Sequence, residues 1–405
     1  MSPALGLAIR NLKMLFRQAD LPAKSFQSRI AAKFSRRVLL TSVLASACGR
    51  KRGPRYQGWL FVASGTEKKI AVADLASFRR VSSIPLPYAP DQLFRAGNRV
   101  FAVCREGQAL LEIDIERFEA GGRIPLPGKP LGVRLLADSD SAIVAADGPS
   151  ALLRVDLTHR KVVAKLPLPG TPGDLDLNES RVALTIPSRN AVVRVSLPQL
   201  QQFQMLGSTD VGVSCRAIGF RRDGKTILAG SRAAREIVAI DAESGQLLSR
   251  LPLPVAPSRF CFIPNGGQMF VTGEGQTAIA IVSPFQNEVA ETILAGSSPY
   301  AMVVEEKRNL LFVTNPASGD LTILDIETRA VSASVHVGEN PGEILLTPDG
   351  EYALVLDQRS GNVSVVRIRT VLDRKAKTNS PPAPLFTVFP TAADARAALI
   401  VPFPA

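Results

Sequence analysis

Residues 309–350, NLLFVTNPASGDLTILDIETRAVSASVHVGENPGEILLTPDG, decide the fold because variants of this stretch recur along the chain. Residues 311–314 are apolar and β-prone, and the turn formers at 315–320 reverse the chain. Residues 321–326 then run back, and two further β-prone segments follow after similar turns. The pattern predicts four short antiparallel strands joined by tight turns, which is one blade of a β-propeller.

Units of this kind follow one another at a steady period. The second strand of each unit is marked by a four-residue core: FVAS at 61, FAVC at 101, IVAA at 143, ALTI at 183, ILAG at 227, FVTG at 270, FVTN at 312 and ALVL at 353. Successive cores lie 40 to 44 residues apart, a period typical of repeat architectures. We predict an all-β, eight-bladed propeller. Seven blades is the alternative if residues 176–210 do not form a proper blade.

Two further features recur in these units. An aspartate ends the third strand of five units, where it can hold the next turn by accepting backbone hydrogen bonds. These aspartates are Asp74, Asp114, Asp156, Asp241 and Asp325. The fourth strand of four units carries the pattern I/L-P-L-P, beginning at residues 84, 124, 166 and 251. Proline lacks an N–H and is confined to sheet edges, so these strands should be outermost in their blades.

The two ends of the repeat array complement each other. The array begins at Trp59 with the second, third and fourth strands of a unit, and it ends with a single strand, RAALIVP at 396–402. Pairing this last strand with the first three would complete a blade and remove a free sheet edge. We therefore assign residues 58–403 to one closed propeller. RKAKTNSPPAP at 374–384 is expected to be a mobile loop before the last outer strand.

The net charge of +12 is concentrated near the N-terminus. Of the 48 basic and 36 acidic residues, 12 and 1 fall within residues 1–55, which leaves 36 and 35 in the remainder. The propeller itself is nearly neutral. The sequence therefore argues against nucleic acid as a partner.

A short apolar run lies within the basic region. SRRVLL at 35–40 opens an uncharged run at 38–47 that ends in small residues before Cys48. This order indicates an export signal, and ten residues are too few to span a bilayer. The paired Arg36 and Arg37 resemble a twin-arginine signal, and the residues before Cys48 resemble a bacterial lipobox, which implies a lipid on Cys48 and attachment to a membrane.

We expect residues 1–47 to be the export signal with a basic extension and residues 48–57 to be a linker. The expected location is the periplasm or the outer cell surface, as a membrane-anchored lipoprotein. A disordered basic tail is the alternative interpretation of the N-terminal region.

FVTN at 312–315, the turn at 338–341 and TPDG at 347–350 together resemble the YVTN-type β-propeller repeat. The resemblance covers residues 58–403. It implies a propeller similar to those of haem-containing nitrite reductases, lactonases, quinoprotein dehydrogenase subunits and bacterial surface-layer proteins. It implies no single activity.

Candidate ligand-binding residues lie in the loops expected at one mouth of the central channel. In a propeller blade, the turn between strands two and three and the connection to the next blade emerge on the same face. Arginines there could form a cationic rim for a carboxylate or phosphate. The candidates are Arg105, Arg189, Arg232, Arg259, Tyr300 and Arg359, with Tyr88, Lys129, Asp174 and Glu343 at neighbouring loop positions. Alternatively, nearby acids neutralise this rim as ordinary loop charge: Glu67, Glu106, Asp147, Glu274, Asp320 and Asp357.

The sequence predicts no metal site, no cofactor and no catalytic residues. His159 and His336, the two histidines, fall in a turn on the opposite face and in an outer strand, which disfavours a haem or catalytic metal site at the channel. Cys104, Cys215 and Cys261 form no C-x-x-C motif, and Cys261 is expected to be a small core residue.

The leading hypothesis from the sequence is a non-catalytic, exported propeller, tethered through Cys48, that binds a protein or a cell-envelope ligand through its channel face. The alternative is a hydrolase acting on a lactone or related ester, or an accessory subunit of a periplasmic oxidoreductase. A cluster of carboxylates and arginines at the channel with perturbed titration would favour the enzyme.

Overall fold

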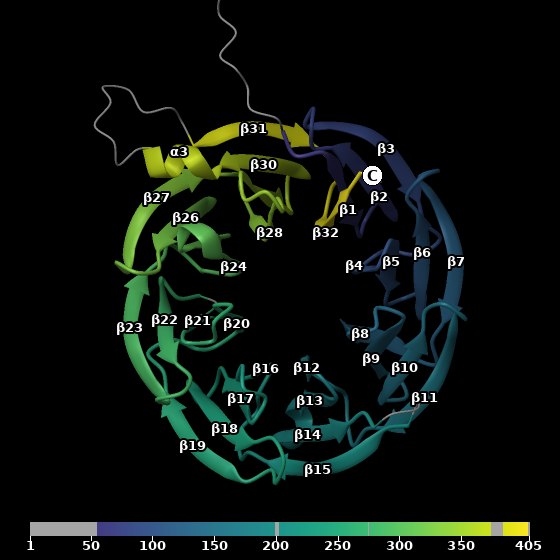
Figure 1. The fold of residues 1–405 in the computed structure, drawn as a ribbon, viewed down its shortest axis with the longest axis vertical. Coiled ribbons are helices and arrows are strands. Elements are labelled where there is room, and N and C mark those ends of the chain that lie inside the picture. The colour runs from purple at the N-terminus through teal and green to yellow at the C-terminus, as the bar shows by residue number, and fades with distance from the viewer. Residues whose placement is uncertain (1–54, 199–201, 274, 374–383, 404–405) are drawn as a thin grey trace, which may run out of the picture. The chain divides into compact units, whose positions relative to one another are not determined.

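A ring of eight four-stranded antiparallel sheets is present in the computed structural model (Figure 1). The structure describes residues 55–198, 202–273, 275–373 and 384–403. The seven-bladed alternative depended on residues 176–210, and the described strands in this region, from Leu175–Asn178 to Gln204–Asp210, form a regular four-stranded sheet. The predicted eight-bladed propeller is therefore confirmed, and the seven-bladed alternative is wrong.

Each blade runs from an innermost to an outermost strand. Blade 1 consists of β32 (Ala395–Pro402), β1 (Gly58–Ser64), β2 (Lys69–Asp74) and β3 (Arg79–Pro85), and blade 2 consists of β4 (Gln92–Ala96), β5 (Arg99–Cys104), β6 (Ala109–Asp114) and β7 (Glu119–Pro125). Blade 3 consists of β8 (Lys129–Leu135), β9 (Ser141–Asp147), β10 (Ala151–Asp156) and β11 (Lys161–Pro167), and blade 4 consists of β12 (Leu175–Asn178), β13 (Arg181–Ile186), β14 (Ala191–Ser196) and β15 (Gln204–Asp210).

Blades 5 to 8 follow in the same order. Blade 5 consists of β16 (Ala217–Phe220), β17 (Thr226–Ser231), β18 (Glu236–Asp241) and β19 (Leu247–Pro252), and blade 6 consists of β20 (Arg259–Phe262), β21 (Met269–Thr272), β22 (Ala278–Ser283) and β23 (Glu288–Leu294). Blade 7 consists of β24 (Met302–Glu305), β25 (Leu310–Asn315), β26 (Asp320–Asp325) and β27 (Ala330–His336), and blade 8 consists of β28 (Pro341–Leu346), β29 (Tyr352–Asp357), β30 (Asn362–Arg367) and β31 (Leu385–Pro390).

Helix is confined to three short pieces in the described part of the chain: η1 (Pro187–Arg189), η2 (Glu306–Arg308) and α3 (Ile368–Asp373). No helix among the described residues is long and apolar enough to cross a bilayer. The Pro- and Lys-rich loop at 374–383 and the leader at 1–54 lie outside the described residues.

The C-terminal strand closes the ring. β32 pairs antiparallel with β1 from Gly58↔Pro402 to Ser64↔Ala395, and Figure 1 shows it as the innermost strand of blade 1. The side chain of Ser64 also donates a 2.5 Å hydrogen bond to the carbonyl of Ala393. The closure predicted from the two chain ends is confirmed.

The hydrophobic core is divided among the junctions between blades. Within the described residues, eight buried clusters each draw residues from two neighbouring blades. Phe61, Phe101, Phe270 and Phe312 open the recurrent second-strand core and are all fully buried. Burying such a side chain contributes about 1.5–3 kcal/mol. The repeat therefore places the largest buried side chains where one blade packs on the next.

The recurrent aspartates and prolines act as predicted. The Asp74 carboxylate accepts hydrogen bonds from the Ala76 N–H and the Ser77 hydroxyl. Asp114, Asp156, Asp241 and Asp325 each accept at least one backbone N–H of the following turn. The first proline of each I/L-P-L-P pattern ends an outermost strand, namely β3, β7, β11 or β19. Both interpretations are confirmed.

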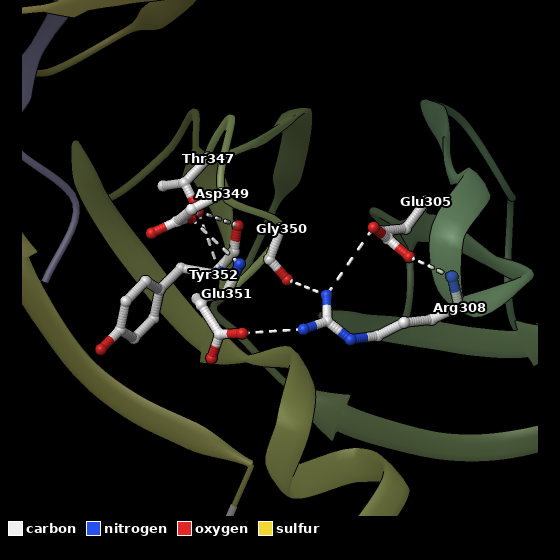
Figure 2. Close-up of polar contacts among 7 residues, drawn as sticks. All are labelled: Glu305, Arg308, Thr347, Asp349, Gly350, Glu351 and Tyr352. Carbon is white, nitrogen blue, oxygen red and sulfur yellow. Dashed lines mark hydrogen bonds and ion pairs between the residues drawn. The ribbon is translucent and has the colours of Figure 1, made fainter. Parts of the chain in front are cut away.

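An arginine joins blades 7 and 8 on the face opposite the channel-face loops (Figure 2). Arg308 donates to the carbonyl of Gly350 and, at 2.7 Å, to the carboxylate of Glu351, while its own N–H donates to Glu305 at 2.6 Å. Thr347 holds the receiving turn, because its hydroxyl accepts the Tyr352 N–H at 3.0 Å. Blade 7 therefore interacts with a turn of blade 8 that has its own internal hydrogen bonds.

Comparable arginine contacts cross every junction in the described ring. Arg396 donates to Asp91 at 2.8 Å between blades 1 and 2, and Arg80 donates to the carbonyl of Thr391 at 2.9 Å between blades 1 and 8. In order from the first junction, the arginines are Arg396, Arg99, Arg134, Arg194, Arg222, Arg329, Arg308 and Arg80. Each blade is thus joined to the next by apolar packing and by at least one guanidinium.

Ring closure by β32 can be tested by truncation. A chain that ends at Pro390 should unfold at least about 10 °C below a control that ends at Phe403, because β1 loses its inner partner and the ring its closure. The measurement is thermal unfolding followed by circular dichroism. Adding a peptide of residues 391–405 should restore part of the loss. Equal midpoints for the two chains would show that closure contributes nothing to stability.

Candidate functional site

The antiparallel order of each blade defines two faces of the ring. The turn between the second and third strands and the connection to the next blade lie on one side, called here the channel face. Three sequence-selected residues meet on this side. Arg259 begins β20, Tyr300 precedes β24, and Glu343 lies in β28, so three consecutive blades contribute one group each.

Arg259 is held between its two neighbours. Its guanidinium donates to the Tyr300 hydroxyl at 2.5 Å and lies over the Tyr300 ring, 4.1 Å from the centroid. A second guanidinium nitrogen lies 3.6 Å from a Glu343 carboxylate oxygen. Aromatic stacking fixes the plane of the guanidinium, while the long distance to Glu343 leaves both charges open to a further partner.

The other four candidate arginines are not brought together. Arg105, Arg189, Arg232 and Arg359 occupy turns of blades 2, 4, 5 and 8. The backbone N–H of Arg105 donates to Asp91 at 2.9 Å, and Arg189 ends η1. Arg359 is strongly exposed and lies 3.3 Å from Glu339. The structure therefore favours loop charge over a continuous cationic rim for these four residues.

The acids expected to neutralise that rim have other partners. Glu106 binds Lys129 at 3.1 Å, and Asp147 accepts the Ser150 and Thr171 hydroxyls. Asp357 accepts the backbone N–H of Arg359 in its own turn and that of Glu339 in the connection from blade 7. Glu67 binds Lys69, and Asp320 faces His336. Glu274 lies outside the described residues. Two of the candidate arginines have acidic partners outside this set, Arg259 with Glu343 and Arg359 with Glu339. Neutralisation of the rim by nearby loop acids therefore stays a prediction.

A cavity of about 430 Å³ lies beside Arg259 in the central channel, and we call it the channel cavity. It is lined from the inner strands of blades 3 to 8 and the connections that lead into them. Its lining residues are Arg134, Asp174, Asp176, Ala217, Ile218, Gly219, Ser258, Arg259, Phe260, Phe262, Ala301, Met302, Glu343 and Ile344. Its volume falls within the range of small-molecule sites, about 300–1,000 Å³, but its accessible wall is more polar than apolar, whereas such sites commonly have mostly apolar walls.

Sequence reasoning missed Arg134 and Asp176, which form a second charged group in this cavity with Asp174. The Arg134 guanidinium lies 3.6 Å from Asp174 and 3.8 Å from Asp176. Asp176 also accepts the Phe220 N–H at 2.8 Å, which links blades 4 and 5. The available signal was the charged residues in VRLL at 133–136 and DLDL at 174–177, which fall in or directly beside two inner strands.

Burial raises the pKa of the Asp174 carboxyl above its usual range. The Arg134 guanidinium and the N–H groups of Leu175 and Ile218 lower the pKa and offset only part of this effect, and the nearby Asp176 raises it further. The side chain is 43% exposed, because it borders the cavity while protein atoms surround its other sides. A charged group brought into the cavity would therefore lie next to Asp174.

The cysteine thiols are poor nucleophiles in this structure. Burial raises the pKa of Cys104 and of Cys215 to about 12, and that of Cys261 to about 11. At neutral pH all three are protonated. Cys261 lies in the inner strand β20 and is only half-buried, packed against the cluster between blades 6 and 7. Among the described residues, no three His, Cys, Asp or Glu side chains are grouped to hold a metal ion.

A larger groove of about 1190 Å³ lies at blades 1 to 3 on the opposite face. Trp59 and Phe118 form part of its wall, with Arg99, Arg160 and Glu112. Three of its charged groups bind one another: Arg99 donates to Glu112 at 2.7 Å, and Arg160 donates to it at 2.6 Å. The channel cavity is the stronger candidate because its charges are less tightly paired.

No family model matches this chain, and no curated protein sequence matches it. Solved structures do match. Dihydro-heme d1 dehydrogenase NirN in complex with DHE superposes with a TM-score of 0.71 at 12% identity, over 85% of this chain and 75% of that one. A functionally unknown protein from Desulfotomaculum acetoxidans DSM 771 superposes with a TM-score of 0.57 at 14% identity, over 71% of this chain and 98% of that chain. Kuenenia stuttgartiensis hydrazine synthase superposes with a TM-score of 0.50 at 14% identity, over 76% of this chain and 88% of that chain. These likenesses establish a shared propeller fold.

The raised pKa of Asp174 predicts a specific pH dependence of stability. Because its folded pKa lies above the unfolded value of about 3.9, ionisation costs folding free energy as the pH rises past that value. Asp174→Asn removes the cost. The melting temperature of the variant, relative to wild type, should therefore rise between about pH 3.5 and about pH 7.

Asp357→Asn is the matched control with the opposite sign. Burial acts to raise the pKa of Asp357, but the N–H groups of Glu339, Ser360 and Arg359 outweigh it and the pKa is lowered. This variant should lose stability near neutral pH and recover relative to wild type as the pH falls. If the melting temperatures of both variants, relative to wild type, changed in the same direction with pH, the opposite pKa shifts of Asp174 and Asp357 would be contradicted.

Proposed function

We propose that this protein is an exported, lipid-anchored propeller that acts as a non-catalytic binding scaffold in the cell envelope. It binds a protein or a cell-envelope ligand at the channel face. The proposal includes the relationship to the YVTN-type repeat, the periplasmic or outer-surface location and the lipid on Cys48. Cys48 and the leader lie outside the described residues, so the export and the lipid attachment are proposed from their sequence patterns alone.

One observation carries the binding role. Three successive blades place Arg259, Tyr300 and Glu343 at the channel cavity, where the ion pair is long and both charged side chains are more than one third exposed. Several ion pairs between blades outside the cavity are tighter, such as the 2.7 Å pair of Arg308 and Glu351. The open arrangement is suited to receive a ligand group between the two charges.

A second candidate function rests on Asp174. A carboxyl with a raised pKa beside an arginine is a feature of acid–base sites, and such a cluster was the condition that favours the enzyme over the scaffold. In a lactone or ester hydrolase, Asp174 would activate water as a general base and Arg134 would stabilise the developing oxyanion. A role as accessory subunit of a periplasmic oxidoreductase is the other alternative. No residue of this chain favours it specifically.

Binding and turnover separate the scaffold from the hydrolase. The purified protein is assayed with lactones, aryl esters and peptidoglycan fragments, following both the melting temperature and hydrolysis. The scaffold predicts an increase of several degrees with a bound ligand, about 2.7 kcal/mol at a hundredfold excess over Kd, and no hydrolysis. The shift should be lost in Arg259→Gln and kept in Arg359→Gln. Turnover that disappears in Asp174→Asn would replace the scaffold with the hydrolase.

Lipid attachment is tested independently in cells. With radiolabelled palmitate, the wild-type chain should carry label in the membrane fraction, and Cys48→Ala should abolish the label. Replacing both Arg36 and Arg37 with lysine should leave unprocessed chain in the cytoplasm. Cys261→Ala is the control, because its thiol lies within the propeller. Label that persists in Cys48→Ala would contradict the anchor.

A further inference from the structure

The charge balance of the channel cavity is negative. Its lining carries three carboxylates, Asp174, Asp176 and Glu343, and two guanidiniums, those of Arg134 and Arg259. With all five groups ionised, the formal charge of this lining is −1. The cationic rim suggested by the loop arginines is therefore absent from the cavity lining, and an anion would meet more negative than positive charge there.

The carboxylates use only part of their hydrogen-bonding capacity on backbone donors: Asp174 accepts the Leu175 N–H at 2.9 Å, and Asp176 accepts the Phe220 N–H at 2.8 Å. The three contacts to guanidiniums measure 3.6, 3.8 and 3.6 Å, longer than a hydrogen bond. By contrast, Arg99 donates to Glu112 at 2.7 Å across the junction of blades 2 and 3. At 3.6–3.8 Å, a carboxylate and a guanidinium still attract each other, but the carboxylate oxygens keep lone pairs that can accept a hydrogen bond from a ligand.

Aromatic and apolar side chains complete the cavity wall. Phe260 and Phe262 of β20 are only half-buried, and Met302 of β24 lies beside them in the lining. Gly219 is required here, because a Cβ at this position would lie 2.8 Å from the Phe262 ring. Aromatic faces attract cations and also accept apolar groups.

We infer that the channel cavity binds a small organic cation, an ammonium or amidinium group on an apolar body. The cationic group lies between the Asp174–Asp176 pair and Glu343, and the apolar body packs on Phe260 and Phe262. This inference rests on the proposed binding function and specifies its ligand class. A bound monovalent cation makes the charge of the lining neutral.

The test uses three probes of similar size: benzyltrimethylammonium, benzyl alcohol and benzoate. Isothermal titration of the purified full protein should show binding of benzyltrimethylammonium, with benzyl alcohol and benzoate at least about tenfold weaker. Asp174→Asn and Glu343→Gln should each weaken binding of the cation by about fivefold to tenfold. Glu339→Gln, which removes an exposed carboxylate outside the cavity, should leave binding unchanged.

Melting temperatures of the variants confirm that each is folded. Benzoate binding as tight as that of the cation, or cation binding that neither variant weakens, overturns the inference. No binding of the cation also overturns it. If benzoate binds and Arg259→Gln abolishes that binding, the channel face remains a binding site and only the ligand class is wrong. If no probe binds and the lactones, esters and peptidoglycan fragments also leave the melting temperature unchanged, the proposed binding function is contradicted as well.

Discussion

Pairing of β32 with β1 is the interaction on which the rest of this structure depends. Each blade packs its apolar faces on two neighbours, and an open array of eight blades would leave two such faces and a sheet edge in water. Bringing residues 395–402 onto residues 58–64 closes the ring and, with it, the channel that contains the cavity. Arg396 of the closing strand then binds Asp91, so the same strand also joins blade 1 to blade 2.

The blade architecture could be predicted from the sequence because it follows from a repeated local pattern. Turn formers, alternating apolar cores and the aspartates that hold turns recur about every 42 residues, and each acts within its own blade. The arginine contacts between blades could not be predicted. Arg99 begins a second strand, Arg194 lies in a third strand, and Arg329 lies in a turn, so no common position in the repeat marks them.

The candidate site was predicted in part for the same reason. Loop position alone placed Arg259, Tyr300, Asp174 and Glu343 on the channel face, and all four lie at or beside the cavity. Arg134 and Asp176 were missed because the candidates were chosen by loop position, whereas both residues lie within inner strands. Loop position also selected Arg105 and Arg359, which point to no shared site, since eight blades distribute their loops around a wide ring.

Site-specific photo-crosslinking in cells tests the central claim, that the channel face is the binding surface. A photoreactive residue is placed at Ser297, in the connection before β24, or at Lys307, in η2 on the opposite face of the same blade. Adducts to an envelope component at position 297 and none at position 307 are the predicted result. Adducts at position 307 alone would contradict the claim and direct attention to the opposite face.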